Sequence, residues 1–141
     1  MYVLVVGAGK VGWNLARELI DKGDEVTVIE QDRRRYLTVE QELEHAVQYG
    51  DATELWVLER AGIQRADLVV AVTGDDEDNL LICQVAKEKY LCDRIIARVL
   101  DPRRAAWYRE QGLQTVCPTA IAIDQLERAA LGEDPVPAGG L

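Results

Sequence analysis

Apolar and polar positions follow one another along the chain in a pattern that predicts six strands alternating with six helices. Short runs of valine, leucine and isoleucine, such as 68–72, are typical of strands buried on both faces of a parallel sheet. Longer stretches with apolar residues at helical spacing indicate amphipathic helices. The predicted strands are 2–6, 25–30, 46–49, 68–72, 94–99 and 114–116, and the predicted helices are 11–20, 32–43, 54–61, 77–90, 102–110 and 119–131.

Repeated strand–helix units of this length imply right-handed crossovers and therefore an α/β fold. We expect a Rossmann doubly wound parallel six-stranded sheet in the order 3-2-1-4-5-6, followed by a C-terminal helix. In that order a ligand crevice lies at the carboxyl ends of the first and fourth strands. Loops 7–12 and 73–76 occupy those ends, so the pattern places two chemically suggestive loops at one crevice.

A G-x-G-x-x-G turn joins the first predicted strand to the first predicted helix. Gly7 suits the tight turn, Gly9 leaves room for a pyrophosphate, and Gly12 allows the helix to pack closely on the strand. Val11 begins the predicted helix 11–20, whose unpaired first N–H groups and positive dipole end attract phosphate. The motif alone is weak, because a tight turn is its simplest explanation, but the strand and helix around it favour a dinucleotide site.

Glu30 ends the second predicted strand, at the spacing where dinucleotide-binding proteins carry an acid for the adenosine ribose. A carboxylate there repels a 2′-phosphate, so we expect NAD(H) to be preferred over its phosphorylated form. ATP or ADP fits the same residues, with phosphates on the glycine turn. The alternative is an acid that is merely solvated at a strand end.

Composition and charge narrow the function classes further. The chain has 141 residues, 48% of them hydrophobic and 29% charged, which is ordinary for one soluble domain. Its net charge of −9 argues against a nucleic-acid partner. No run approaches the ~20 apolar residues needed to span a bilayer, and no basic-then-apolar leader precedes the first strand. We therefore expect a cytoplasmic protein without direct membrane insertion, which would act at a membrane only through a partner.

Three smaller features carry alternatives. The basic run 33–35 is either a solvated helix face or supplies one arginine to an adenine ring or a phosphate. The cysteines are widely spaced, as expected for buried, reduced thiols: Cys83, Cys92 and Cys117. His45, the only histidine, has no ligand partner at metal-binding spacing, so no metal site is expected.

Two further segments add specificity to the glycine turn. Gly50-Asp51-Ala52-Thr53 follows the third predicted strand, and Thr73-Gly74-Asp75-Asp76 with Asn79 follows the fourth. Together with residues 5–12, these motifs resemble the RCK/KTN (Trk-type) N-terminal NAD-binding domain of bacterial potassium transport regulatory proteins. The resemblance spans about residues 1–131.

The resemblance implies a regulatory nucleotide-binding domain with no catalytic residue and no metal ligand. NAD(H) is the first expected ligand, and ATP, ADP or AMP the alternatives. The implied contacts are Gly7, Gly9, Lys10, Val11 and Gly12 for the phosphates, Glu30 for the adenosine ribose, Asp51 and Ala52 for the adenine edge, Thr73, Gly74 and Asp75 for the distal ribose or terminal phosphates, and Arg98 for a terminal phosphate or a subunit contact.

Assembly is also implied by the resemblance: a homo-oligomer, either a dimer or an octameric ring, on a potassium-conducting membrane protein. Residues 1–131 would form the nucleotide-binding domain, including a crossover helix at 119–131, and residues 132–141 a disordered tail. The apolar side of that helix either folds back on its own domain or docks on a neighbouring subunit. Many family members continue into a second, C-terminal lobe that binds other small ligands or ions.

Two other functions compete with the regulatory one. The first is the cofactor domain of an NAD-dependent oxidoreductase, which needs an acid–base residue near the nicotinamide. Against it, His45 lies at the start of a strand, no Tyr-x-x-x-Lys spacing occurs, and no residues remain for a substrate domain. The second is a nucleotide-binding fragment whose role is mainly oligomerisation.

Overall fold

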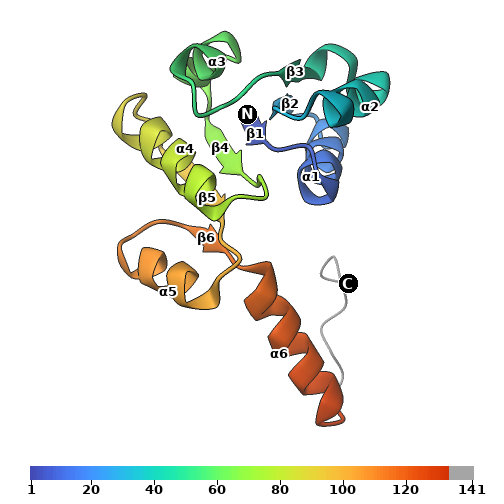
Figure 1. The fold of residues 1–141 in the computed structure, drawn as a ribbon, viewed down its shortest axis with the longest axis vertical. Coiled ribbons are helices and arrows are strands. Elements are labelled where there is room, and N and C mark those ends of the chain that lie inside the picture. The colour runs from blue at the N-terminus through green and yellow to red at the C-terminus, as the bar shows by residue number, and fades with distance from the viewer. Residues whose placement is uncertain (134–141) are drawn as a thin grey trace.

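The computed structural model describes residues 1–133 and contains a six-stranded parallel sheet in the order β3-β2-β1-β4-β5-β6 (Figure 1). The predicted fold class and strand order are thereby confirmed. No helix in this described part is long and apolar enough to cross a membrane. The strands are β1 Tyr2–Val6, β2 Glu25–Glu30, β3 Val47–Tyr49, β4 Leu68–Ala71, β5 Arg94–Arg98 and β6 Thr115–Val116. The helices are α1 Lys10–Asp21, α2 Arg33–Leu43, α3 Leu55–Arg60, α4 Asp76–Glu88, α5 Pro102–Glu110 and α6 Pro118–Ala130, with 3₁₀ turns at Glu44–Ala46 and Ile63–Arg65.

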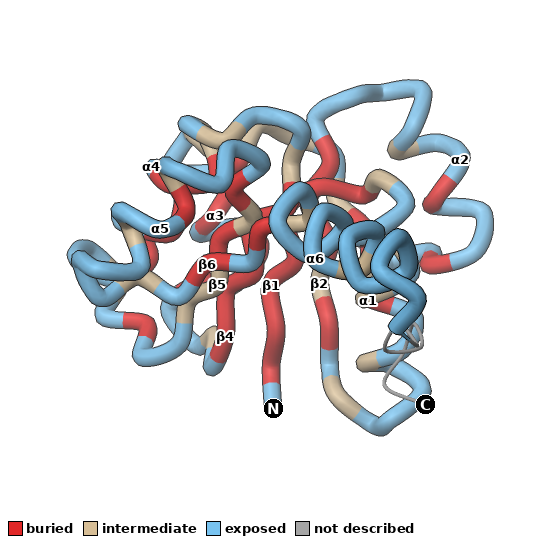
Figure 2. Tube along the Cα trace, turned by 90° about the horizontal axis from the view of Figure 1, so that it is seen from below, coloured by how far each residue is buried: buried red, intermediate tan, exposed pale blue. Residues whose placement is uncertain are grey.

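Two hydrophobic cores lie on opposite faces of the sheet, because successive strand side chains point to opposite faces. In β1, Tyr2, Leu4 and Val6 join one core, and Val3 and Val5 join the other. Helices α3, α4 and α5 contribute to the first core, and α1 and α2 to the second. Figure 2 shows the central strands as the most continuously buried part of the chain. This packing fixes the carboxyl ends of the central strands, where the candidate site lies.

Aspartates occupy the N-cap position of several helices, including Asp32 at the start of the predicted helix 32–43. The Asp32 carboxylate accepts a hydrogen bond from the Arg35 N–H and caps α2. Thr53 directly precedes the predicted helix 54–61, and the sequence therefore predicts that its hydroxyl caps that helix. This prediction is wrong, because Glu54 holds the cap position of α3 without a side-chain hydrogen bond within the described chain. Thr53 instead donates through its N–H and its hydroxyl to Asp51 Oδ1, at 2.9 and 2.7 Å. A carboxylate two residues earlier competes successfully for the threonine, as in an Asx turn.

All three cysteines are buried and free, in agreement with the expectation of reduced thiols. Cys83 lies within α4 and is completely buried. Burial raises the pKa of its thiol to about 12, so this group is protonated at neutral pH. The cysteines therefore act as core residues.

Helix α6 extends away from the sheet and does not fold back on its own domain (Figure 1). The apolar side chains of Ile121, Ile123 and Leu126 are 51%, 54% and 70% exposed. Of the two alternatives for this helix, packing against its own domain is thus excluded by the structure. Its apolar surface remains open in the single chain.

The end of α6 is closed by Gly132, which has a φ of +81°. The Gly132 N–H donates to the Ala129 carbonyl at 3.1 Å, and the Glu133 N–H donates to the Arg128 carbonyl at 2.8 Å. These two bonds form a Schellman cap. Residues 132 and 133, assigned to the tail by the sequence, therefore belong to the helix end. The rest of the predicted disordered tail, 134–141, lies outside the described residues.

Candidate functional site

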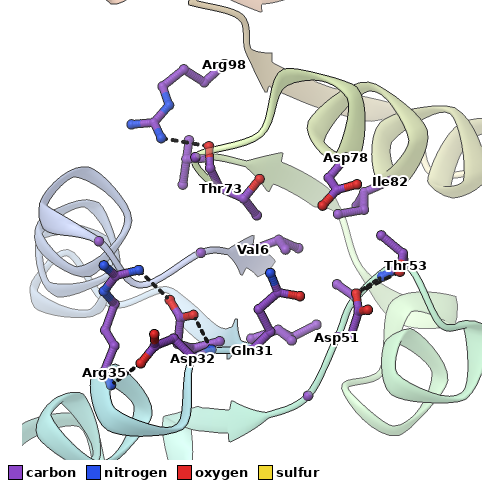
Figure 3. Close-up of a pocket in the computed structure, with 18 of the residues that line it drawn as sticks. Val6, Gln31, Asp32, Arg35, Asp51, Thr53, Thr73, Asp78, Ile82 and Arg98 are labelled. Carbon is purple, nitrogen blue, oxygen red and sulfur yellow. Dashed lines mark hydrogen bonds and ion pairs between the residues drawn. The ribbon is translucent and has the colours of Figure 1, made fainter.

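A cavity of about 410 Å³ opens where the carboxyl ends of β1, β2 and β4 meet (Figure 3). This volume lies within the range of roughly 300–1,000 Å³ that small-molecule sites occupy. All sequence-predicted site residues line it except Gly12 and Asp75. The lining residues are Val6, Gly7, Gly9, Lys10, Val11, Ile29, Glu30, Gln31, Asp32, Arg35, Gly50, Asp51, Ala52, Thr53, Val72, Thr73, Gly74, Asp78, Ile82 and Arg98.

Gly7 and Gly12 hold the glycine turn against the sheet. Gly7 has a φ of +104°, and a Cβ built on it would lie 2.9 Å from the Thr73 nitrogen. A Cβ on Gly12 would lie 1.8 Å from the Gly7 carbonyl oxygen, which is far inside van der Waals contact. Gly12 thus supports the turn from beneath, as the sequence predicts, and does not line the cavity.

Gly9 has a different role from the other two glycines. It is the N-cap of α1, with ordinary extended backbone angles, and a built Cβ would meet no atom of the described chain within 4 Å. Among the described residues no side chain caps α1, so the first N–H groups of that helix remain available to an anion. The open space and the available donors coincide at the cavity wall.

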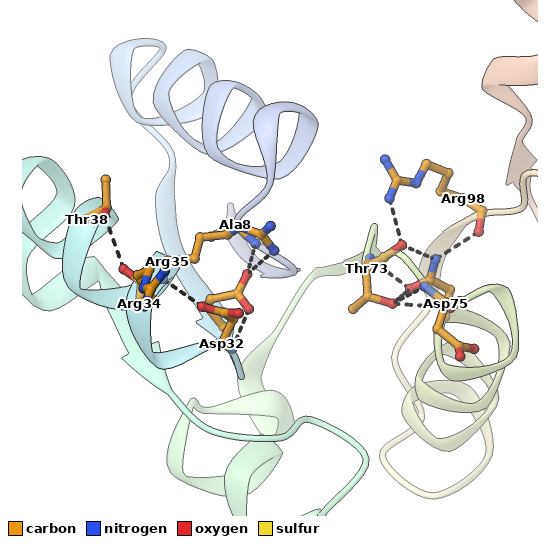
Figure 4. A network of polar contacts seen from close by, with 10 residues as sticks. Ala8, Asp32, Arg34, Arg35, Thr38, Thr73, Asp75 and Arg98 are labelled. Carbon is orange, nitrogen blue, oxygen red and sulfur yellow. Dashed lines mark hydrogen bonds and ion pairs between the residues drawn. The ribbon is translucent and has the colours of Figure 1, made fainter.

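Glu30 is buried and holds three elements together (Figure 4). Its Oε1 accepts a hydrogen bond from the Ala8 N–H at 2.9 Å, and its Oε2 accepts one from the Asp32 N–H at 2.8 Å. Arg35 Nη1 lies 3.6 Å from Oε1. Each carboxylate oxygen has a second lone pair, so Glu30 can also accept from a ligand hydroxyl at the cavity. The acid therefore links the glycine turn to the start of α2.

The basic run 33–35 divides between the two roles that the sequence left open. Arg35 reaches the cavity beside Glu30. Arg33 instead lies over the Tyr49 ring, with its guanidinium carbon 5.9 Å from the ring centroid. Only one arginine of the run is therefore placed to meet a ligand.

Thr73 and Arg98 form the opposite wall of the cavity (Figure 3). Arg98 Nη2 donates a hydrogen bond to the Thr73 carbonyl at 2.7 Å. Its Nε is buried and has no hydrogen-bond partner among residues 1–133. Beneath this wall, Asn79 is fully buried and bonded to both residues. The sequence signal for Asn79 was its spacing after Thr-Gly-Asp-Asp, but that pattern gave it no role.

Aspartates from two loops and one helix surround the remaining side. Asp75 caps α4 by accepting from the Asp78 N–H at 3.0 Å, so its carboxylate is directed to the helix and not to the cavity wall. Asp78 lines the cavity, and burial together with the charges of Asp75 and Asp51 raises the pKa of its carboxyl group. Sequence reasoning missed Asp78, together with Gln31, Asp32 and the placement of Arg35.

Metal chemistry finds no support in the described residues, where no group of three or more His, Cys, Asp or Glu could hold an ion. His45 lies in the 3₁₀ turn before β3, at the amino end of that strand, whereas the cavity lies at the carboxyl ends of the strands. The cavity wall instead combines cations, acids and backbone donors.

The sequence matches one family of domains and is similar to curated potassium uptake proteins. The sequence model of the TrkA-N domain matches residues 3–129. The Trk system potassium uptake protein TrkA homolog of Methanothermobacter thermautotrophicus is 39% identical over 129 residues, which are 91% of this chain and 59% of the relative. The Trk system potassium uptake protein TrkA of Mycobacterium tuberculosis is 41% identical over 103 residues, 73% of this chain and 46% of the relative. The chain thus spans about half the length of these relatives.

Solved structures share the fold. The Shewanella denitrificans Kef CTD in AMP-bound form has a TM-score of 0.75 and 25% identity, covering 94% of this chain and 83% of that chain. The structure of GsuK bound to ADP has a TM-score of 0.75 and 25% identity, covering 90% of this chain and 33% of that chain. The GsuK channel bound to NAD has a TM-score of 0.72 and 24% identity, covering 89% and 22%, which shows the fold alone.

Proposed function

The chain belongs to the TrkA-N domain family, and from that membership we propose that it is a regulatory nucleotide-binding domain of a potassium uptake system or channel. The observation that carries the proposal is the cavity where the glycine turn, Glu30 and Arg98 face one another. Nucleotide binding there would favour one subunit arrangement over another, because a ligand shifts an equilibrium only by binding the two states differently.

The cavity fits an adenine nucleotide. The open space at Gly9 and the uncapped start of α1 suit phosphates, and Arg98 offers a buried donor without a partner in the described chain. When bound, the nucleotide supplies phosphate charge and ribose hydroxyls. NAD(H) is the first candidate, since Glu30 suits a free ribose. AMP and ADP are supported by the bound structures of Kef and GsuK, and ATP fits the same donors.

The roles that we propose for individual residues follow the cavity wall. Gly7, Gly9, Lys10 and Val11 hold the phosphates, with Gly12 supporting the turn, and Glu30 accepts from the adenosine ribose. The remaining roles are Asp51 and Ala52 at the adenine edge, Thr73 and Gly74 near the distal ribose or terminal phosphates, and Arg98 at a terminal phosphate. Asp75 caps α4 and supports this loop from outside the cavity.

Calorimetric titration with NADH, NAD, ATP, ADP and AMP tests this proposal. We expect saturable binding of at least one of them, and the tightest ligand identifies the physiological class. Analysis of any nucleotide that co-purifies with the protein provides an independent check. If none of the five binds, the domain is not a nucleotide sensor.

Replacing Glu30 with glutamine should weaken nucleotide binding by on the order of 1–3 kcal/mol, because the charged acceptor for the ribose is lost. One amide oxygen remains to accept from Ala8 or Asp32, so the glycine turn keeps part of its support. The preference for NADH over NADPH should also fall, since the repulsion of a 2′-phosphate is gone. Titrations of both cofactors measure these effects. Glu18→Gln on the exposed side of α1 is the matched control, and equal affinities in both variants would remove Glu30 from the site.

A regulatory role, and not catalysis, is what we propose for this cavity. The alternative, the cofactor domain of an NAD-dependent oxidoreductase, requires a substrate beside the nicotinamide and a proton-transferring group. The chain's single histidine precedes β3 and therefore lies at the amino end of the strands, away from the cavity at their carboxyl ends. Substrate-dependent oxidation of NADH by the isolated chain would favour the enzyme.

We further propose that residues 1–131 form one domain whose helix α6 crosses to a neighbouring copy of the chain. The exposed Ile121, Ile123 and Leu126 support this, since apolar faces of this kind mark interfaces. A groove of about 420 Å³ between β6, α5 and α6 lies beside them. The expected assembly is a homodimer or an octameric ring on the cytoplasmic side of a potassium-conducting membrane protein.

Leu126→Asp should convert that oligomer to monomer, because an unpaired charge buried in an apolar interface costs several kcal/mol. Leu126 is 70% exposed in the single chain, so the fold should be unaffected. Size-exclusion chromatography with light scattering measures the mass. Arg128→Gln lowers the net charge by the same amount, but two residues further along α6 and therefore on the opposite side of the helix, and serves as the control. An unchanged mass for Leu126→Asp would place the interface elsewhere.

A further inference from the structure

Asn79 makes four hydrogen bonds beside the cavity, to Thr73 and Arg98, the two residues labelled on the β4 and β5 side of Figure 4. It is 0% exposed. Its Oδ1 accepts from the Thr73 N–H at 2.9 Å and from the Thr73 hydroxyl at 2.6 Å. Its Nδ2 donates to the Thr73 carbonyl at 3.1 Å and to the Arg98 carbonyl at 3.0 Å. Both hydrogens of the amide and both lone pairs of its oxygen are therefore used within the protein.

These bonds join the carboxyl ends of β4 and β5, which are neighbouring strands of the sheet. Thr73 follows β4, and Arg98 ends β5. Asn79 comes from the first turns of α4, so one side chain fixes the position of both loop backbones. The Thr73 carbonyl accepts from the Asn79 amide and from the Arg98 guanidinium, at 3.1 and 2.7 Å. The amide thus sets the position of the oxygen on which the guanidinium rests.

Arg98 is the cation on this side of the cavity, whereas Lys10 and Arg35 approach from α1 and α2. A first phosphate on the glycine turn lies next to the start of α1. A phosphate chain that starts on the glycine turn would be able to extend toward the β4 and β5 loops, because the ligand crevice runs between the two halves of the sheet. Arg98, whose buried Nε has no partner in the described chain, is the donor left for a second phosphate.

We propose that Asn79 is a positioning residue that sets the preference of this site for nucleotides with two or more phosphates over nucleoside monophosphates. The proposal rests on the proposed function, nucleotide binding at this cavity. Without the amide, the polar backbone groups of Thr73 and the Arg98 carbonyl lose their buried partner, and both loops relax. The guanidinium then leaves the position from which it meets a second phosphate. Contacts of a monophosphate with the glycine turn and Glu30 are unaffected.

Titration of AMP and ADP into the wild type, Asn79→Ser and Asn79→Ala tests the proposal. Both substitutions are neutral, so they add no charge that would itself repel ADP. We expect the dissociation constant for ADP to rise about tenfold or more, as for loss of a charged hydrogen bond, while that for AMP changes less than about threefold. Asn14, the chain's other asparagine, is exposed, so Asn14→Ala serves as the matched control. Leu80→Val on α4 controls for loss of core packing next to Asn79.

A double-mutant cycle separates positioning from a general loss of structure. Arg98→Gln should weaken ADP and spare AMP, and adding Asn79→Ser to it should have little further effect, because the two residues act through one contact. A purely structural role for Asn79 predicts equal losses for AMP and ADP and an additive cycle. Either result overturns the proposal, as does a wild type that binds AMP at least as tightly as ADP. Thermal unfolding without ligand verifies that each variant is folded.

If both Asn79 variants fail to fold, Thr73→Val provides a second route. It removes the hydroxyl that donates to Asn79 Oδ1, together with the contacts of that hydroxyl to the Asp75 backbone. The bonds of the Thr73 N–H and carbonyl to Asn79 are kept. The ratio of the ADP to the AMP dissociation constant should then rise in the same direction by a smaller factor, and an unchanged ratio overturns the proposal. A wild type that binds neither nucleotide contradicts nucleotide binding itself and not the role of Asn79 within it.

Discussion

Replacing Gly12 with alanine should prevent the domain from folding stably. The added Cβ would lie 1.8 Å from the Gly7 carbonyl oxygen and 3.1 Å from Cγ2 of Val72. Backbone is the obstacle, so α1 would have to move off the sheet, and Gly7 is itself held against the end of β4. We expect a loss of more than about 3 kcal/mol in the free energy of unfolding, as for severe overpacking. Urea unfolding followed by circular dichroism measures it.

Gly23→Ala is the control for this experiment. Gly23 has a φ of +95°, but a Cβ there would meet no described atom within 4 Å. Only the left-handed backbone should cost stability, about 1–2 kcal/mol. Equal losses at the two positions would mean that close packing of α1 on β1 contributes nothing, and the geometry of the glycine turn would have to be revised.

Gly9→Val should leave the protein folded and abolish nucleotide binding. The φ of −69° and ψ of −170° at Gly9 suit any residue, and the space around it is open. The free energy of unfolding should fall by only about 1 kcal/mol or less, from the poorer N-cap. A branched side chain in that space blocks the approach of phosphate to the backbone, so we expect affinity to fall at least about 100-fold. Calorimetry with the tightest nucleotide measures the loss.

Two further variants calibrate the Gly9 result. Gly9→Ala adds only a methyl group and should reduce affinity by a smaller factor than valine does. Thr119→Val places the same side chain at the start of another helix, α6, and should bind as the wild type does. Wild-type affinity in Gly9→Val would show that the phosphates do not lie on this turn.

Much of the fold was predictable because its signals are local. Apolar runs such as 2–6 and 68–72 mark strands buried on both faces, and the alternation of strands with helices predicts a doubly wound sheet and its strand order. Thr53 shows where local rules fail. Its position favours a helix cap, but the nearby Asp51 carboxylate takes its hydroxyl and N–H. Where a side chain has two possible hydrogen-bond partners, the choice between them depends on three-dimensional geometry, which the sequence pattern does not contain.

Residues of the candidate site could be predicted from the sequence where the residue type and its spacing have one common structural role. Gly7, Gly9 and Glu30 are of this kind: their residue types and spacing predict a dinucleotide site, and all three line the cavity. Asn79 and Arg35 were not placed, because their roles depend on how α4 and α2 are rotated against the sheet. The Ala8 N–H that binds Glu30 left no signal at all, since every non-proline residue carries such a donor.

The two edges of the sheet differ from its centre in length. The outermost strands, β3 and β6, have 3 and 2 residues, whereas β1 and β2 have 5 and 6. Short edges expose few unpaired backbone groups and therefore give other chains little template for strand addition. Copies of this protein at high concentration are thus protected against growth into continuous intermolecular sheets. The exposed apolar face of α6 is helical, so it offers no unpaired strand edge to which further strands could attach.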